Sequence, residues 1–139
     1  MDDGQTLRQA KENEMATPKK YLLVAEDDRF YANVYTNKLA KEGYEVKVVG
    51  DGQQILDAVK ERIPDLILLD LVMPVKDGFE TLKELKADEK TKNIPVIVLS
   101  SLGQEEDATK VRELGATDYF VKTNITIHDM VGKIKDHLG

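Results

Sequence analysis

Short runs of consecutive apolar residues alternate with longer amphipathic stretches along most of the chain. The clearest run, 66–69, is apolar at every position and lies between Pro64 and Pro74. Such a run, bounded by turn residues, is typical of a strand that is buried on both faces of a sheet. Asp70 follows at once, so a carboxylate is predicted at the carboxyl end of a buried strand.

Five strands are predicted, each followed by a helix. The strands are expected at 21–25, 44–49, 65–70, 94–99 and 118–121. The helices are expected at 28–41, 53–62, 104–114 and 126–138, with one more that carries Phe79, Leu82 and Leu85. Strands that alternate with helices through short connections form a parallel sheet with helices on both faces. The predicted fold class is α/β, a doubly wound five-stranded parallel sheet.

The composition excludes several classes of protein. The absence of cysteine rules out disulfides and thiolate metal sites, and two histidines argue against a multi-histidine site. A net charge of −6 argues against nucleic acid as a direct ligand. No apolar run is long enough to span a bilayer, and the acidic start is unlike a secretory signal, so no membrane contact and a cytoplasmic location are predicted.

The first 19 residues differ from the rest of the chain because they contain few apolar side chains. We expect a tail or linker at 1–19 that is mobile, and one domain at 20–139. A short helix in the tail that docks onto the domain is the alternative, but Pro18 would end it.

Polar residues follow four of the predicted strands. They are Glu26, Asp27 and Asp28 after the first strand, Asp70 after the third, Ser100 and Ser101 after the fourth, and Lys122 after the fifth. Asp51, after the second strand, is given no role. The carboxyl ends of parallel strands meet in one crevice, where ligands bind. A helix cap or turn would explain any one of these groups alone, but four strands that end this way favour a site.

Carboxylates that converge must raise a pKa, bind a cation or pair with the lysine. Oxygen ligands without His or Cys suit Mg²⁺. A carboxylate can also act as a nucleophile and form an acyl phosphate. The candidate chemistry is therefore metal-assisted phosphoryl transfer, in which a lysine and a hydroxyl would neutralise charge on the moving group.

These motifs, in this order and spacing, resemble the receiver domains of bacterial two-component response regulators over about 20–138. The matching segments are 22–28, 64–74 with Asp77 and Gly78, 95–100 and 115–122. The resemblance implies the flavodoxin-like strand order 2-1-3-4-5. It also implies a signalling switch rather than an enzyme that turns over a substrate.

The resemblance implies a metal site and a phosphoryl acceptor. Asp70 is the expected acceptor. The expected ligands of Mg²⁺, for which Mn²⁺ can substitute, are Asp27, Asp70, the backbone carbonyl of Val72 and, through water, Glu26.

The resemblance also implies a switch. Ser100 and Lys122 are expected to contact the phosphoryl group, and Tyr119 is expected to rotate inward when Ser100 moves. A histidine kinase or histidine phosphotransfer protein would donate the group. The face made by the helix at 104–114, the fifth strand and the last helix would then change, control a partner, and offer a surface for a homodimer. A stand-alone receiver, a relay intermediate or phosphate sink, and a piece of a longer chain all stay open.

Three rival functions are weaker. An aspartate-dependent phosphatase usually has a second Asp two residues after the nucleophile, where this chain has Val72. A flavin-binding module needs a Ser-, Thr- or Gly-rich loop where this chain has acids. A receiver that signals without phosphate would not need the intact site.

The chain departs from the family at a few positions. Thr123 stands where a proline, often with a cis peptide bond, follows the lysine. Either the bond is trans and the loop is reshaped, or a cis bond is held at a cost of about 2.5–4 kcal/mol. Ser101 is small enough to leave access to the site. Val72 and Leu102 flank the expected path of water, so slow self-dephosphorylation is predicted. His128 is interpreted as a surface histidine.

Overall fold

The computed structural model describes residues 18–101 and 103–138, so almost all of the predicted tail lies outside the described residues. Five parallel strands form one sheet in the order β2-β1-β3-β4-β5, which confirms the predicted fold class and strand order. The strands are β1 (Tyr21–Ala25), β2 (Glu45–Val49), β3 (Leu66–Asp70), β4 (Val96–Ser100) and β5 (Asp118–Val121). The helices are α2 (Arg29–Lys41), α3 (Gly52–Glu61), α4 (Gly78–Ala87), α5 (Glu105–Glu113), the 3₁₀ helix η1 (Lys122–Asn124) and α6 (Ile127–Leu138).

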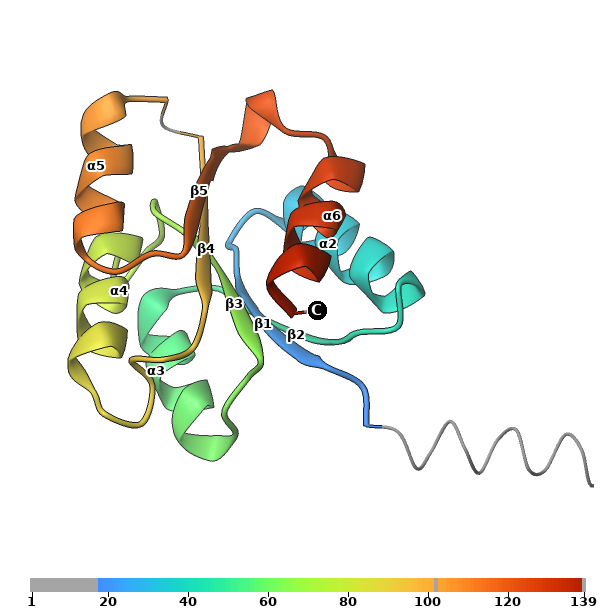
Figure 1. Ribbon diagram of the computed structural model, residues 1–139, viewed down its shortest axis with the longest axis horizontal. Helices are drawn as coiled ribbons and strands as arrows, with labels where there is room; N and C mark the ends of the chain where they lie inside the picture. Colours follow the sequence, from blue (N-terminus) through green and yellow to red (C-terminus); the bar gives the residue numbers. More distant parts are fainter. Residues whose placement is uncertain (1–17, 102, 139) are drawn as a thin grey trace, which may run out of the picture.

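Helices cover both faces of the sheet (Figure 1). Helices α3, α4 and α5 pack on one face through a core that includes Ile55, Leu82 and Val111. Helices α2 and α6 pack on the other face through a core that includes Leu39 and Ile134. Every residue of β1, β3 and β4 is buried, which explains why these strands are continuous apolar runs.

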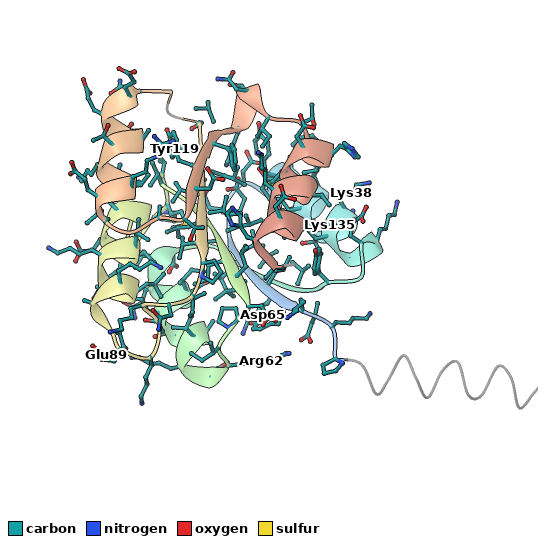
Figure 2. The ribbon with its side chains drawn as sticks, in the orientation of Figure 1. Lys38, Arg62, Asp65, Glu89, Tyr119 and Lys135 are labelled. Atoms are coloured by element: carbon teal, nitrogen blue, oxygen red, sulfur yellow. The ribbon has the colours of Figure 1, made fainter. Side chains whose placement is uncertain are left out.

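An ionic contact joins α2 to α6 at the rim of the second layer. Lys38 and Lys135, which Figure 2 places side by side on the two helices, both reach the carboxylate of Glu42, at 3.6 and 2.6 Å. The three side chains are partly exposed to solvent, so the contact contributes little to stability. No helix in the part of the chain that the structure describes is both long and apolar enough to cross a membrane.

Local sequence signals fix where the helices begin and end. Asp28, Asp51 and Asp77 accept hydrogen bonds from backbone amides in the first turns of α2, α3 and α4, so Asp51 acts as a helix cap. Gly43 and Gly115 follow α2 and α5 with φ of +94° and +103°. Their amides, and those of the next residues, close Schellman motifs on the last turns.

One local prediction was wrong, and one element was not predicted. Phe30 was expected on the inner face of α2, but it is 70% exposed, and its neighbour Tyr31 packs against the core instead. The η1 turn was not predicted, because its three residues carry no periodic signal.

Gly78 brings α4 into direct contact with the end of β3. Its amide donates to the carbonyl of Leu71 at 2.9 Å. A Cβ atom here would lie 2.3 Å from the carbonyl oxygen of Asp70 and 2.7 Å from Cα of Leu71. Only glycine therefore lets the helix start against the backbone that carries Asp70.

We expect Gly78→Ala to lower the free energy of unfolding by about 1–3 kcal/mol, because backbone atoms must move to admit the methyl group. Gly132→Ala is the matched control, since a Cβ at this position in α6 meets nothing within 4 Å. There the same change should stabilise the protein by about 0.5–1 kcal/mol. Urea unfolding measures the free energy of unfolding of both variants. If both substitutions changed it in the same direction, the packing argument would be contradicted.

Candidate functional site

The carboxyl ends of four strands meet at one edge of the sheet. The register pairs Ala25 with Leu69 and Asp70 with Leu99, so the residues at the ends of β1, β3 and β4 lie at the same level. Ser100 is paired with Val121, which precedes Lys122. The parallel register therefore delivers the polar residues predicted for the site to one place.

Three carboxylates form the centre of the site. Glu26, Asp27 and Asp70 offer oxygen atoms that all lie within 4.8 Å of one another. Glu26 and Asp70 are buried, at 3% and 5% exposure, whereas Asp27 is exposed. Asp28 turns away and caps α2, with its Oδ1 accepting from the amide of Phe30 at 2.8 Å. The structure thus separates the acid that caps the helix from those that face the crevice.

Lys122, which directly follows β5, reaches the carboxylates that follow β1 and end β3. Its Nζ donates to both oxygens of Glu26 at 2.7 and 2.8 Å, and to Oδ2 of Asp70 at 3.1 Å. No peptide bond among the described residues is cis, so Lys122 and Thr123 are joined in trans. The reshaped loop is the η1 turn, which starts at Lys122 itself.

The charges of the cluster are unevenly balanced. Burial raises the pKa of Glu26 to about 8, and Asp70 adds to the rise while Lys122 opposes it. Burial would lower the pKa of Lys122, but Glu26 and Asp70 outweigh burial and raise it. The lysine therefore stays charged, and a single ammonium does not fully compensate the carboxylates. A further cation would be stabilised here.

The donor set fits a hard divalent metal ion. All three side chains offer carboxylate oxygens, which such ions prefer, and the exposed Asp27 gives an ion access from solvent. The other oxygen of Asp70, Oδ1, accepts from the amide of Val72 at 3.3 Å, which orients the carboxylate. The predicted role of the Val72 carbonyl as a ligand stays a prediction.

The two predicted switch residues are neighbours. Ser100 is fully buried at the end of β4, and Tyr119 is half-buried in β5 and packs on the α3–α4–α5 side (Figure 2). Burial and Asp107 raise the pKa of Tyr119, while a hydrogen bond with Ser100 opposes the rise. This hydrogen bond links a residue of the crevice to one that lies beside α5.

One close neighbour of the site was missed at the sequence level. The ring of Tyr31 in α2 lies under Lys122, with 4.5 Å from Nζ to the ring centroid. Helical spacing marks Tyr31 only as a core-facing aromatic, because periodicity does not tell which end of the sheet a helix turn covers. Leu102, predicted to flank the water path, lies outside the described residues.

The comparison with protein families decides the class of this site. Residues 22–135 match the model of the response regulator receiver domain. The chain belongs to this family. It is therefore a receiver domain, the phosphorylation-activated signalling module of two-component systems, as the resemblance implied.

Sequence relatives are full-length response regulators. The chain is 38% identical over 108 residues to the DNA-binding response regulator MtrA of Mycobacterium bovis, covering 78% of this chain and 46% of that protein. It is 43% identical over 101 residues to the transcriptional regulatory protein CpxR of Escherichia coli K12, covering 73% and 42%. The chain thus spans about half the length of the curated relatives it matches.

Solved structures show the same fold. The BeF₃-activated N-terminal receiver domain of Klebsiella pneumoniae RstA has a TM-score of 0.79 at 27% identity, covering 86% of this chain and 98% of that one. The Mn²⁺-bound form of response regulator Rcp1 has a TM-score of 0.74 at 28% identity, covering 84% and 90%.

We expect Asp27→Asn to weaken the binding of a divalent cation, tested with Mg²⁺ and Mn²⁺, at least about tenfold, since it removes a charged ligand from the exposed side of the cluster. Asp28→Asn is the matched control: it changes the next acid, and asparagine still caps the helix. Titration calorimetry should give this control an affinity within about twofold of wild type. Equal losses of cation affinity in both variants would show that the overall negative charge, and not the position of Asp27, determines binding.

Proposed function

We propose that Asp70 accepts a phosphoryl group from the phosphohistidine of a histidine kinase or histidine phosphotransfer protein. The observation that carries this proposal is the 3.1 Å contact between Asp70 and Lys122, inside a cluster of three carboxylates at the sheet edge. A buried carboxylate with one cation and room for another is suited to a reaction that brings in a dianion. Lys122 and the second cation would then neutralise the negative charge of the phosphoryl group.

The transfer is a direct displacement at phosphorus. An oxygen of Asp70 forms a bond to phosphorus as the bond from phosphorus to the imidazole nitrogen breaks. The electron pair of the broken bond stays on the imidazole, which takes a proton from solvent. Lys122 then neutralises charge on the phosphoryl oxygens. The domain takes part in one transfer per signal, so we propose a signalling module and not an enzyme with its own substrate.

The acidic cluster is proposed to hold Mg²⁺, with Mn²⁺ as a substitute. Asp27 and Asp70 would be direct ligands, the Val72 carbonyl a third, and Glu26 would act through water. When bound, the ion would supply positive charge that reduces the repulsion between the Asp70 carboxylate and an incoming phosphoryl group. The order of burial supports this assignment, because Asp27 is exposed while Glu26 is occupied by Lys122.

The switch is proposed to run through Ser100 and Tyr119. A phosphoryl group on Asp70 would attract the Ser100 hydroxyl, which is now hydrogen-bonded with Tyr119. Tyr119 would then take a new position beside α5. Phosphorylation would thus bias an existing equilibrium of the face formed by α5, β5 and α6.

That face is proposed to control a partner, which is either an output domain of the same protein or a separate molecule, and to be available for a homodimer. MtrA is a DNA-binding response regulator, and the chain matches only part of it. We propose that residues 20–139 form the receiver domain and that it acts in the cytoplasm of a bacterium.

Wild-type protein with Mg²⁺ and acetyl phosphate should gain the mass of one phosphoryl group, and Asp70→Asn should gain none, because the amide is no nucleophile. Asp51→Asn is the control, since Asp51 follows β2 and caps α3. It should be labelled like wild type in intact-mass spectrometry. Labelling of Asp70→Asn at the wild-type level would exclude Asp70 as the acceptor.

We expect the phosphorylated domain to lose its phosphoryl group over minutes or longer, because the 54% exposed Val72 cannot orient an attacking water. Val72→Asn should accelerate the loss several-fold. Val75→Asn makes the same change at an 83% exposed position of the same loop and should not accelerate it. Its φ of +67° is one that asparagine tolerates. Release of phosphate from the isolated protein measures the rate, and a wild-type lifetime of seconds would contradict the argument.

A further inference from the structure

Lys122 has a contact with Tyr31 that the proposed transfer does not use. The lysine has three N–H donors, and three carboxylate oxygens accept them. The Tyr31 ring meets the ammonium from another direction, at 4.5 Å from Nζ to the centroid. A ring face at this distance attracts a cation through its quadrupole, most strongly where water is excluded. The Lys122 side chain is only 5% exposed, so this condition is met.

The backbone around Lys122 gives the ammonium little support. The η1 turn has no side-chain cap, and Thr123 and Asn124 are both exposed. Thr123 and Asn124 therefore do not anchor the turn, and the first residue after it that packs against the α2–α6 core is Ile125. With the family's usual proline absent at Thr123, the contacts of the head group contribute to the position of Nζ.

The Tyr31 ring is itself held in place. It lies edge-on to Phe30, with 5.6 Å between centroids, and tilted against Tyr35 at 5.9 Å. Tyr35 is buried in the α2–α6 core. On the other side, Tyr31 and Lys122 line a cavity of about 130 Å³ with Ile125. Because Tyr35 is buried and Phe30 is exposed, Tyr35 is the neighbour that restricts the orientation of the Tyr31 ring.

We propose that Tyr31 is a positioning residue, which holds the Lys122 ammonium at the site by a cation–π contact and takes the place of the missing backbone constraint. This inference rests on the proposed function. When a phosphoryl group occupies Asp70, Lys122 exchanges its contact with Oδ2 of Asp70 for a phosphoryl oxygen. The ring contact is not exchanged in this step. The ring contact keeps the ammonium within reach of both the carboxylate oxygens and the phosphoryl oxygens.

The test is the affinity of the domain for beryllofluoride, a phosphoryl mimic, measured by calorimetry at saturating Mg²⁺. Tyr31→Leu keeps apolar bulk but removes the ring, and we expect about tenfold weaker binding. Tyr31→Phe keeps the ring and should bind within about twofold of wild type. Phe30→Leu is the matched control: it removes the neighbouring ring, which is 70% exposed, and leaves the contact between Tyr31 and Lys122 in place, so it should bind like wild type.

A second series excludes a loss of folding as the cause. Mono-, di- and trifluorinated phenylalanine at position 31 keep the shape of the ring while they weaken its negative face. The logarithm of the affinity should fall steadily with each fluorine. Equal affinities along the series, or wild-type affinity in Tyr31→Leu, would overturn the proposal. If wild type itself binds no beryllofluoride, the proposed phosphoryl acceptor is refuted instead, so the two failures are distinct.

Discussion

The site depends on the contact of one buried ammonium with two buried carboxylates. Lys122 meets Glu26 and Asp70 with side-chain exposures of only a few per cent on each partner. Charges in such surroundings are costly unless they are paired, and removal of one partner leaves the others uncompensated. These three charged groups also join the ends of β1, β3 and β5, which are distant along the chain. It is therefore both the electrostatic centre of the crevice and a constraint on its shape.

The remaining features of the fold serve to bring these three groups together. The parallel register places the strand ends at one level, and Gly78 lets α4 begin against the backbone of Asp70. Lys122 begins the η1 turn without the family's proline after it, and the Tyr31 ring lies against its ammonium. Burial, together with Asp70, raises the pKa of Glu26, and the exposed Asp27 leaves the cluster open to a cation from solvent.

A site of this kind responds to charge by changing which partners its polar groups use. Ser100 is hydrogen-bonded with Tyr119, and Tyr119 packs on the same side of the sheet as α5. A new acceptor at Asp70 would compete for the Ser100 hydroxyl. In the proposed mechanism, this competition would shift the position of the Tyr119 ring and so bias the equilibrium between two states of the domain.

The sequence alone determined the fold class, the strand order through the family resemblance, and the convergence of Glu26, Asp27, Asp70, Ser100 and Lys122. It did so because buried strands need continuous apolar runs and parallel strands end at one edge. Only the tertiary structure decided that Lys122 pairs with both Glu26 and Asp70, and that Tyr31 lies under the ammonium. These outcomes depend on distances between segments far apart in the chain, and local pattern carries no information about such distances.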